Sequence, residues 1–240
     1  MWRTEYIGPV FRRLIQGLTQ RLPSRCAVCH AWPSRPVCEA CVNAFAQPCH
    51  RCQTCARALL AATRQCGACI LTPPPLDACL TAVAYAYPWS DLVGDFKFRE
   101  QPGWAATFAQ LLRAAPWVEP ALESCDMLMP MPMSKERLRE RGYNQSHVLA
   151  TALDRQKVAQ DILLRVTDTP PQRTLPRSER LRSVQHAFAV DPFKVEYVRG
   201  KRIVVLDDVM TSGASLHAAA SALRASGAAH ITGMVFARTE

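Results

Sequence analysis

The run from Ile203 to Ser215 constrains the fold of this chain more than any other stretch. Residues 203–206 read Ile-Val-Val-Leu, which is typical of a strand buried in a parallel sheet. Asp207 and Asp208 follow, where we expect the strand to leave its sheet, and a loop of small residues comes next. After the loop, apolar residues recur at the spacing of one helix face: Leu216, Ala219, Ala220 and Leu223. The run therefore predicts strand, acidic pair, loop and helix.

This arrangement suits a phosphorylated sugar. Loop amides and the positive end of a helix bind phosphate. Carboxylates at the end of a strand accept hydrogen bonds from vicinal ribose hydroxyls, and open α/β sheets bind ligands at that end. The competing interpretation is an ordinary strand–turn–helix with a solvated acidic pair. That interpretation does not explain why every position of the run carries the residue type that a sugar-phosphate site needs. The loop residues expected to hold the phosphate are Thr211, Ser212, Gly213, Ala214 and Ser215.

The cysteines give a second strong constraint, because nine of the eleven lie between residues 26 and 69. Four C-x-x-C pairs occur there: Cys26/Cys29, Cys38/Cys41, Cys49/Cys52 and Cys66/Cys69. Two such pairs complete a tetrahedral site of four thiolates, so sequential pairing predicts two structural zinc ions. Cys52 also forms a C-x-x-C with Cys55, so the second site has an alternative composition. His30 and His50, each directly after a cysteine, are alternative ligands.

Amino-acid composition and a proline-rich connector suggest three segments. Residues 1–25 carry five arginines among apolar positions, which predicts a short amphipathic segment without the apolar core of a signal peptide. Residues 26–75 are too few to bury a core, so metal binding would supply free energy for folding. The connector Thr72–Pro75 ends this region, and residues 76–240 form the main domain. No run approaches the ~20 apolar residues of a membrane span, and we expect a cytoplasmic protein.

The main domain alternates strands and helices. We expect strands at residues 81–87, 125–131, 162–166, 202–206 and 231–237, and helices at 89–98 and 104–112, separated by Pro102-Gly103. Such alternation predicts an α/β fold with a mainly parallel sheet flanked by helices. The formal net charge of +9 suits polyanions, either nucleic acid or a pyrophosphate-bearing substrate, without choosing between them.

The run at 203–215 closely resembles the phosphoribosyl pyrophosphate (PRPP) signature of type I phosphoribosyltransferases. With the cysteine pairs and the order of elements, nearly the whole chain resembles the ComF family, of the competence and DNA-uptake type. The resemblance implies a type I phosphoribosyltransferase-like fold with a small N-terminal zinc-ribbon module, in which each zinc ion has four cysteine ligands. It implies PRPP as ligand, Mg²⁺ bound with PRPP, and transfer of phosphoribosyl to a nitrogen acceptor.

The resemblance also assigns residues. Asp207 and Asp208 would orient the ribose in catalysis, and residues 211–215 would bind the 5′-phosphate. Arg137 and Arg141, one helical turn apart, would face the pyrophosphate, although a solvated helix face is the alternative for this basic run. The family pattern favours Cys49/Cys52 and leaves Cys55 as a spare thiol. The zinc ligands implied are Cys26, Cys29, Cys38 and Cys41 for one ion, and Cys49, Cys52, Cys66 and Cys69 for the other.

Two further segments match the family in part. Lys97 falls in a lysine–aromatic motif, where it is either a ligand or a lysine whose stem covers an amphipathic helix. Residues 168–182 fit the loop that closes over the active site in this superfamily. Within that pattern, Ser183 stands where asparagine is usual. The matching residues of this pattern are Thr169, Gln172 and Arg180.

The acceptor stays open. Hypoxanthine-type enzymes carry an aspartate at the position of Thr211, so a purine base of that kind is not expected. A second class of function is a binding protein without turnover, in which the basic surface and zinc ribbons contact single-stranded DNA or DNA-processing competence proteins. A scaffold without any ligand is the third possibility.

Overall fold

The computed structural model describes residues 24–61, 63–166 and 187–240. The predicted N-terminal segment, up to residue 23, and the predicted closing loop, with Thr169, Gln172, Arg180 and Ser183, lie outside these residues. Internal contacts divide the chain into two units, Met1–Ala44 and Phe45–Glu240. The cysteine-rich region is therefore divided between the units, and its second half belongs to the unit that holds the sheet.

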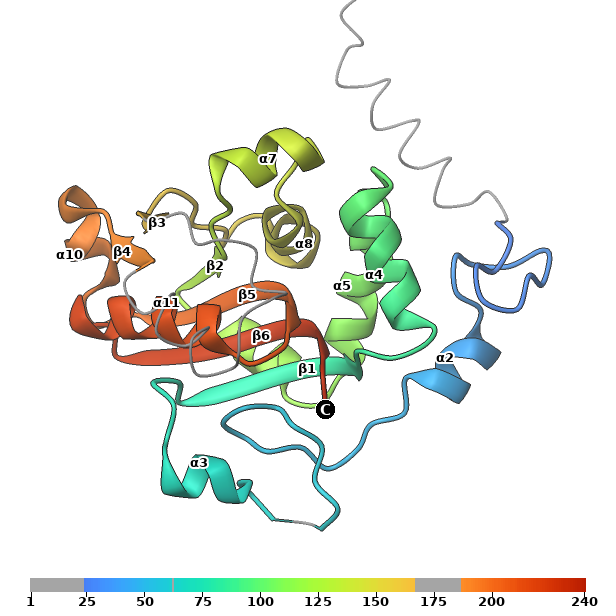
Figure 1. Ribbon diagram of the computed structural model, residues 1–240, viewed down its shortest axis with the longest axis horizontal. Coiled ribbons are helices and arrows are strands. Elements are labelled where there is room, and N and C mark those ends of the chain that lie inside the picture. Colours follow the sequence, from blue (N-terminus) through green and yellow to red (C-terminus); the bar gives the residue numbers. More distant parts are fainter. Residues whose placement is uncertain (1–23, 62, 167–186) are drawn as a thin grey trace, which may run out of the picture. The chain divides into compact units, whose positions relative to one another are not determined.

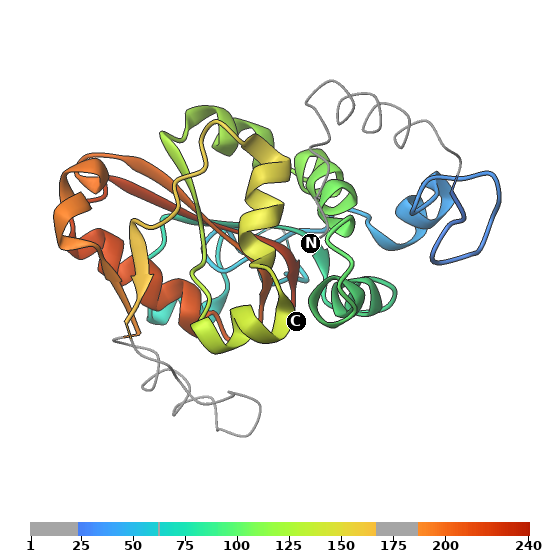
Figure 2. The same ribbon diagram turned by 90° about the horizontal axis from the view of Figure 1, so that it is seen from above.

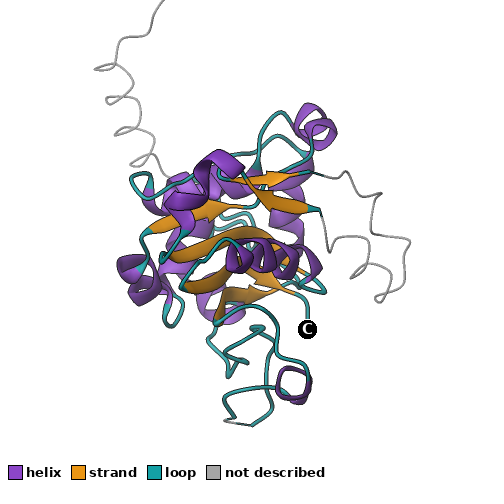
Figure 3. Cartoon of the chain, turned by 90° about the vertical axis from the view of Figure 1, so that its left-hand side faces the viewer, coloured by secondary structure: helices purple, strands orange, loops and turns teal. Residues whose placement is uncertain are grey.

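The larger unit is built on four parallel strands in the order β1-β6-β5-β2, which confirms the predicted parallel sheet (Figure 1). Residues 203–206 at its centre are at most 1% exposed, because both sheet faces are covered there. Figure 3 shows these strands side by side with the twist expected of a parallel sheet. The strands are β1 (Ala78–Ala84), β2 (Met127–Pro130), β5 (Arg202–Met210) and β6 (His230–Arg238).

Helices cover both faces of this sheet. On one face, Gly233 of β6 lies against Leu216 so closely that a Cβ atom would not fit. On the other face, the ring of Phe236 stacks on Phe108 with centroids 3.9 Å apart and meets Trp89 edge-on. The helices are α4 (Trp89–Phe98), α5 (Trp104–Ala114), α6 (Val118–Ser124), α7 (Lys135–Arg141), α8 (Gln145–Asp154), α10 (Val195–Val198) and α11 (Ala214–Ala225), with a 3-10 turn at Pro192–Lys194.

A short antiparallel pair, β3 (Leu163–Arg165) and β4 (Phe188–Val190), stands apart from the main sheet (Figure 2). The predicted strand at 81–87 is displaced, since β1 starts at Ala78 and ends at Ala84 in register with β6. The acidic pair was predicted to follow the end of its strand, and this is wrong. β5 continues through Asp207 and Asp208 to Met210, because β6 offers paired positions up to Arg238.

The cysteine-bearing segments add two short helices, α2 (Glu39–Phe45) and α3 (Gly67–Leu71). In the larger unit, this segment is hydrogen-bonded to the sheet, since the backbone N–H of Cys79 in β1 donates to the carbonyl of Gln53 at 2.7 Å. Among the helices of the described part of the chain, none combines the length and apolar character needed to cross a membrane.

Candidate functional site

The acidic pair lies at the carboxyl-terminal side of the sheet and is tied to two helices. Ser146, at the start of α8, donates its hydroxyl to Asp207 Oδ1 at 2.8 Å, and the backbone N–H of Asp208 donates to the same oxygen at 2.9 Å. Lys97, near the end of α4, places its Nζ atom 2.8 Å from Asp208 Oδ1. Asp208 is 5% exposed, so this pair is mostly shielded from solvent.

Asp207 is a half-buried acid beside a buried one, Asp208. Burial, and then the charge of Asp208, raise the pKa of Asp207 from 3.8 to about 6, although Lys97 and the Ser146 hydroxyl act in the opposite direction. A carboxylate held in this way is a strong acceptor at neutral pH, because its charge is only partly compensated. Ribose hydroxyls are suitable donors to it.

The loop after β5 forms a small hollow of about 40 Å³. Gly213 has φ +84°, a left-handed conformation that favours glycine, and a Cβ atom there would displace the end of the Met210 side chain. Gly213 is also the N-cap residue of α11, which places the positive end of a twelve-residue helix at the hollow. The hollow is lined by Asp207, Val209, Met210, Thr211, Ser212, Gly213, Ala214, Ser215 and Leu216. The structure thus brings together the predicted loop residues and the first acid.

The basic segment forms α7, whose first turn is capped by Ser134 accepting from the Arg137 backbone N–H. Arg141 is half-buried, donates to Gln145 Oε1 at 3.2 Å and lies over the Phe98 ring at 4.9 Å from its centroid. Burial lowers the pKa of Arg141, Asp208 raises it, and the like charge of Arg137 lowers it again. Arg141 therefore feels the charges of Asp208 and Asp207, and the pyrophosphate role of Arg137 and Arg141 stays a prediction.

Sequence reasoning did not assign three polar residues at the site. Lys97 was left between two interpretations, and the structure favours a site role because its ammonium pairs with Asp208. Ser146 and Tyr143 were not predicted; the Tyr143 hydroxyl donates to the carbonyl of Phe96, which fastens the α7–α8 connection to α4. Asn144, the N-cap of α8, was the available signal that a helix begins directly before Ser146.

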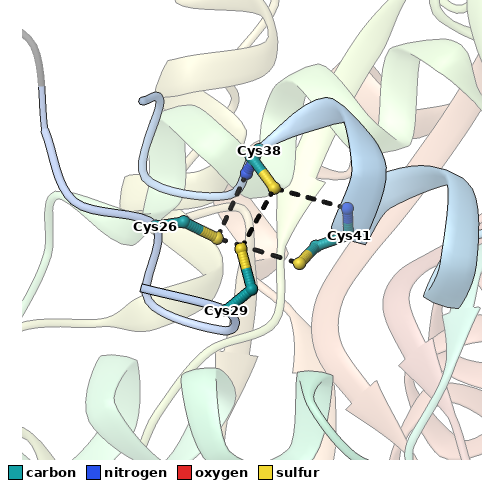
Figure 4. Close-up of side chains that lie close together, drawn as sticks. All are labelled: Cys26, Cys29, Cys38 and Cys41. Carbon is teal, nitrogen blue, oxygen red and sulfur yellow. Dashed lines mark hydrogen bonds between the residues drawn. The ribbon is translucent and has the colours of Figure 1, made fainter. Parts of the chain in front are cut away.

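The first cysteine cluster is formed as predicted by Cys26, Cys29, Cys38 and Cys41, whose four sulfurs lie within 4.8 Å of one another (Figure 4). The Cys29 and Cys38 sulfurs are 3.5 Å apart, and those of Cys26 and Cys41 are 3.9 Å apart. A tetrahedron with Zn–S bonds of about 2.3 Å requires sulfurs roughly 3.8 Å apart. The four sulfurs of this cluster point toward one another and fit that geometry.

The second cluster corrects the prediction. It consists of Cys52, Cys55, Cys66 and Cys69, again with all sulfurs within 4.8 Å. Cys55, predicted to be spare, lies 3.7 Å from the Cys66 sulfur, whereas Cys49 is exposed and outside the cluster. The turn at 52–55 is closed by the Ala56 N–H bonding to the Cys52 carbonyl at 2.8 Å, which brings the Cys55 thiol to the same side as that of Cys52.

In each cluster, backbone N–H groups lower the pKa of one cysteine and so favour its thiolate form. Burial alone would raise the pKa of Cys26, but backbone N–H groups led by that of Cys38 lower it to about 6. In the second cluster, the N–H of Cys66 and its neighbours outweigh burial in the same way and lower the pKa of Cys52 to about 7. All eleven cysteines carry free thiols. Both four-cysteine sets are thus compatible with structural zinc.

Comparisons with known proteins agree with this site. Residues 148–239 match the phosphoribosyl transferase domain family, a segment that holds the acidic pair and the loop. The chain is 29% identical over 233 residues to the DNA utilization protein YhgH of Salmonella typhimurium, covering 91% of this chain and 98% of that protein. It is 31% identical over 188 residues to competence protein F of Haemophilus influenzae, covering 75% and 81%. With competence protein ComFC of Bacillus subtilis, it shares 39% identity over 103 residues, 43% and 40% of the two chains.

Proposed function

Because the chain belongs to the competence protein F (ComF) family, we propose that it binds PRPP on the run from Asp207 to Ser215 and serves DNA uptake. The names of its relatives, which refer to DNA utilization and competence, support the biological setting. The phosphoribosyl transferase domain supports the ligand class. We place this function in the cytoplasm, in keeping with the family resemblance.

The proposed reaction transfers the phosphoribosyl group to a nitrogen acceptor whose identity is open. The bond between C1 of the ribose and the pyrophosphate oxygen breaks, a C1–N bond forms, and the acceptor nitrogen releases its proton. Asp207 and Asp208 would hold the ribose hydroxyls, and the loop would hold the 5′-phosphate. Arg137 and Arg141 would face the leaving group, as preorganised positive charge.

Magnesium fits this assignment. Asp207 and Asp208 offer carboxylate oxygens, which are the donors that Mg²⁺ prefers. Bound with PRPP, Mg²⁺ would supply neutralisation of the pyrophosphate charge. Because Lys97 already pairs with one oxygen of Asp208, the acids would contribute mainly by orienting hydroxyls and water.

The observation that carries the proposal is the hollow itself. One carboxylate, a glycine loop and a helix N-terminus converge on about 40 Å³, and each recognises a different part of a sugar phosphate. An ordinary strand–turn–helix would not require a glycine at the left-handed position together with a half-buried acid.

Calorimetric titration with PRPP, with and without Mg²⁺, tests the proposal. Asp208→Asn keeps the shape but removes the charge, so we expect affinity to fall about ten- to a hundredfold. The matched control is Asp126→Asn, since Asp126 also pairs with a lysine on this sheet but at its opposite end. Unchanged PRPP affinity both in Asp208→Asn and in Asp207→Asn, whose carboxylate lines the hollow, would remove the basis for a sugar-phosphate site.

A second function is favoured by the net charge of +9 and by the relatives' names. In it, the protein binds single-stranded DNA or a DNA-processing partner without turnover. Titration with an oligonucleotide should then show affinity that falls steeply with salt, because phosphate contacts release counterions. Binding that ignores salt, or no binding at low salt, would contradict a direct DNA role.

A further inference from the structure

Arg238, the last residue of β6, joins the second cysteine cluster to the phosphate loop. Its Nε atom donates to the carbonyl of Cys55 at 3.0 Å. Its Nη1 atom donates to the carbonyls of Met210 at 3.1 Å and Thr211 at 2.5 Å. Arg238 is 3% exposed, so these bonds are made away from solvent. A single guanidinium thus contacts a cluster cysteine, the last residue of β5 and the first residue of the loop.

A buried cation persists here because its donors bond to backbone carbonyls where the pairing of β5 with β6 ends. The Met210 carbonyl also accepts from the Thr239 N–H at 3.0 Å, and Arg238 Nη1 also donates to the Thr239 carbonyl. β5 ends at Met210, and its register partner on β6 is Arg238 itself. Guanidinium has five N–H donors in a fixed plane, and each carbonyl acceptor offsets part of the cost of burial. Burial lowers the pKa of Arg238, but an arginine stays charged at any physiological pH.

The cluster is fastened to the sheet at a second point. Glu240 accepts from Arg51 Nη1 at 2.7 Å and from the backbone N–H of Ala58 at 2.8 Å. The carbonyl of Gln53 accepts from the N–H of Cys79. These contacts flank Cys55 on both sides, so the position of its carbonyl follows from the folding of this cluster. Four thiolates on one ion would fix that fold, since a segment this short buries little apolar surface.

Peptide geometry connects Arg238 to ligand binding. In a trans peptide, the carbonyl and the following N–H point in opposite directions. Holding the Thr211 carbonyl toward Arg238 therefore turns the Ser212 N–H to the other side of that peptide. The Met210 carbonyl, which accepts from both Arg238 and the Thr239 N–H, fixes the direction of the Thr211 N–H in the same way. Both residues line the hollow at the start of α11, where amides must face a phosphate.

We propose that Arg238 is a positioning residue for the phosphate loop, and that the metal state of the second cluster, through Cys55, sets how well the loop binds a phosphate ester. The first cluster lies in a different unit and has no such role. This inference rests on the proposed function and adds a metal-linked control to it. Zinc loss from Cys52, Cys55, Cys66 and Cys69 would release the Cys55 carbonyl and, with it, the orientation of Arg238.

The first test compares ligands. Arg238→Met should weaken PRPP about tenfold or more, since hydrogen bonds to charged groups are being lost from the loop. Inorganic pyrophosphate would be bound by the α7 arginines and not by the loop. The pyrophosphate affinity of Arg238→Met should therefore stay within about twofold of wild type. Arg238→Lys, which keeps the charge and fewer donors, should fall between. The matched control is Arg224→Met, because Arg224 also bonds two carbonyls but at the far end of α11.

The second test leaves Arg238 intact. Cys66→Ser removes a ligand of the second cluster and Cys38→Ser a ligand of the first, and both cysteines are half-buried. Each variant should lose one zinc equivalent, but only Cys66→Ser should weaken PRPP. The inference would be overturned if Cys66→Ser and Arg238→Met bound PRPP as tightly as wild type. If Asp208→Asn lost PRPP affinity in the same experiment, the proposed function would still stand.

Hydrogen exchange tests the connection without any ligand. Amides of residues 208–216 should exchange faster in Arg238→Lys and in Cys66→Ser than in wild type. Their exchange rates should be unchanged in Cys38→Ser and Arg224→Met. If wild type fails to bind PRPP, the proposed function is wrong. Hydrogen exchange would still show whether the second cluster and Arg238 hold the loop in place. Unchanged exchange at 208–216 in Cys66→Ser would overturn it.

Discussion

The Nζ atom of Lys97 lies 2.8 Å from Oδ1 of Asp208, and only 19% and 7% of the two side chains are exposed. The pair joins the end of α4 to β5, so one acid of the proposed sugar site has a counterion before any ligand arrives. Lys97 lies outside the segment that matches the phosphoribosyl transferase domain, residues 148–239. The site therefore extends into the first half of the larger unit.

Replacing Lys97 should destabilise the fold as well as the site. Lys97→Met leaves Asp208 buried without its cation, and breaking such a pair costs about 3 kcal/mol in the free energy of unfolding. Urea unfolding would measure this cost. The double variant Lys97→Met/Asp208→Asn should recover part of it, because no unpaired charge remains. Lys135→Met, on the exposed start of α7, is the control and should be neutral. A neutral Lys97→Met would show that the pair contributes nothing.

The parallel sheet and the loop between β5 and α11 could be predicted because their signals are local. The apolar run 203–206, the small residues around Gly213 and the spacing of α11 each report on neighbouring positions. The Lys97–Asp208 pair could not be predicted, because it depends on how α4 packs against the sheet. The length of β5 depends on β6. The ligand set of the second cluster was predicted wrongly, because Cys49 and Cys55 are equally spaced from Cys52 and the family pattern favoured Cys49.

Asp207 should make stability depend on pH. Its folded pKa of about 6 lies above the ordinary 3.8, so the native state holds the proton more tightly. The contribution of Asp207 to the free energy of unfolding is therefore fully present below about pH 3.8 and is lost as the pH rises through about 6. Asp207→Asn lacks the penalty and should be about 3 kcal/mol more stable than wild type at pH 8, with the difference shrinking below pH 6. Thermal unfolding at several pH values would measure it.

The same variant should lose ligand affinity. Below about pH 6, Asp207 takes up a proton and becomes a poorer acceptor for a ribose hydroxyl, so PRPP affinity of the wild type should fall. The phosphates also titrate near pH 6, and Asp207→Asn separates the two effects because only the phosphate part persists in it. An identical pH profile in both proteins would argue against Asp207 as a sugar ligand.

Gly213→Ala should abolish tight PRPP binding. The left-handed φ costs an alanine about 1 kcal/mol, and the added Cβ would push aside the ends of the Met210 and His217 side chains that shape the loop, the latter 2.9 Å away at Nε2. Gly200→Ala is the matched control, since Gly200 has φ +71° with nothing within 4 Å of an added Cβ. Both variants should lose similar stability from strain, but only Gly213→Ala should lose PRPP. Equal affinity in the two variants would show that the loop shape is not needed.

Elemental analysis of the cysteine variants decides the composition of the second cluster. Wild type purified without added metal should hold about two zinc equivalents, one for each set of four cysteines. Cys55→Ser should hold about one, because three thiolates and a hydroxyl bind zinc far more weakly. Cys49→Ser should keep both, because Cys49 is exposed and outside the cluster. The two cysteines sit three residues either side of Cys52, so the comparison changes position and little else. Loss of zinc from Cys49→Ser with retention in Cys55→Ser would restore the Cys49/Cys52 pairing that the sequence first suggested, and would leave Arg238 bonded to a residue with no metal.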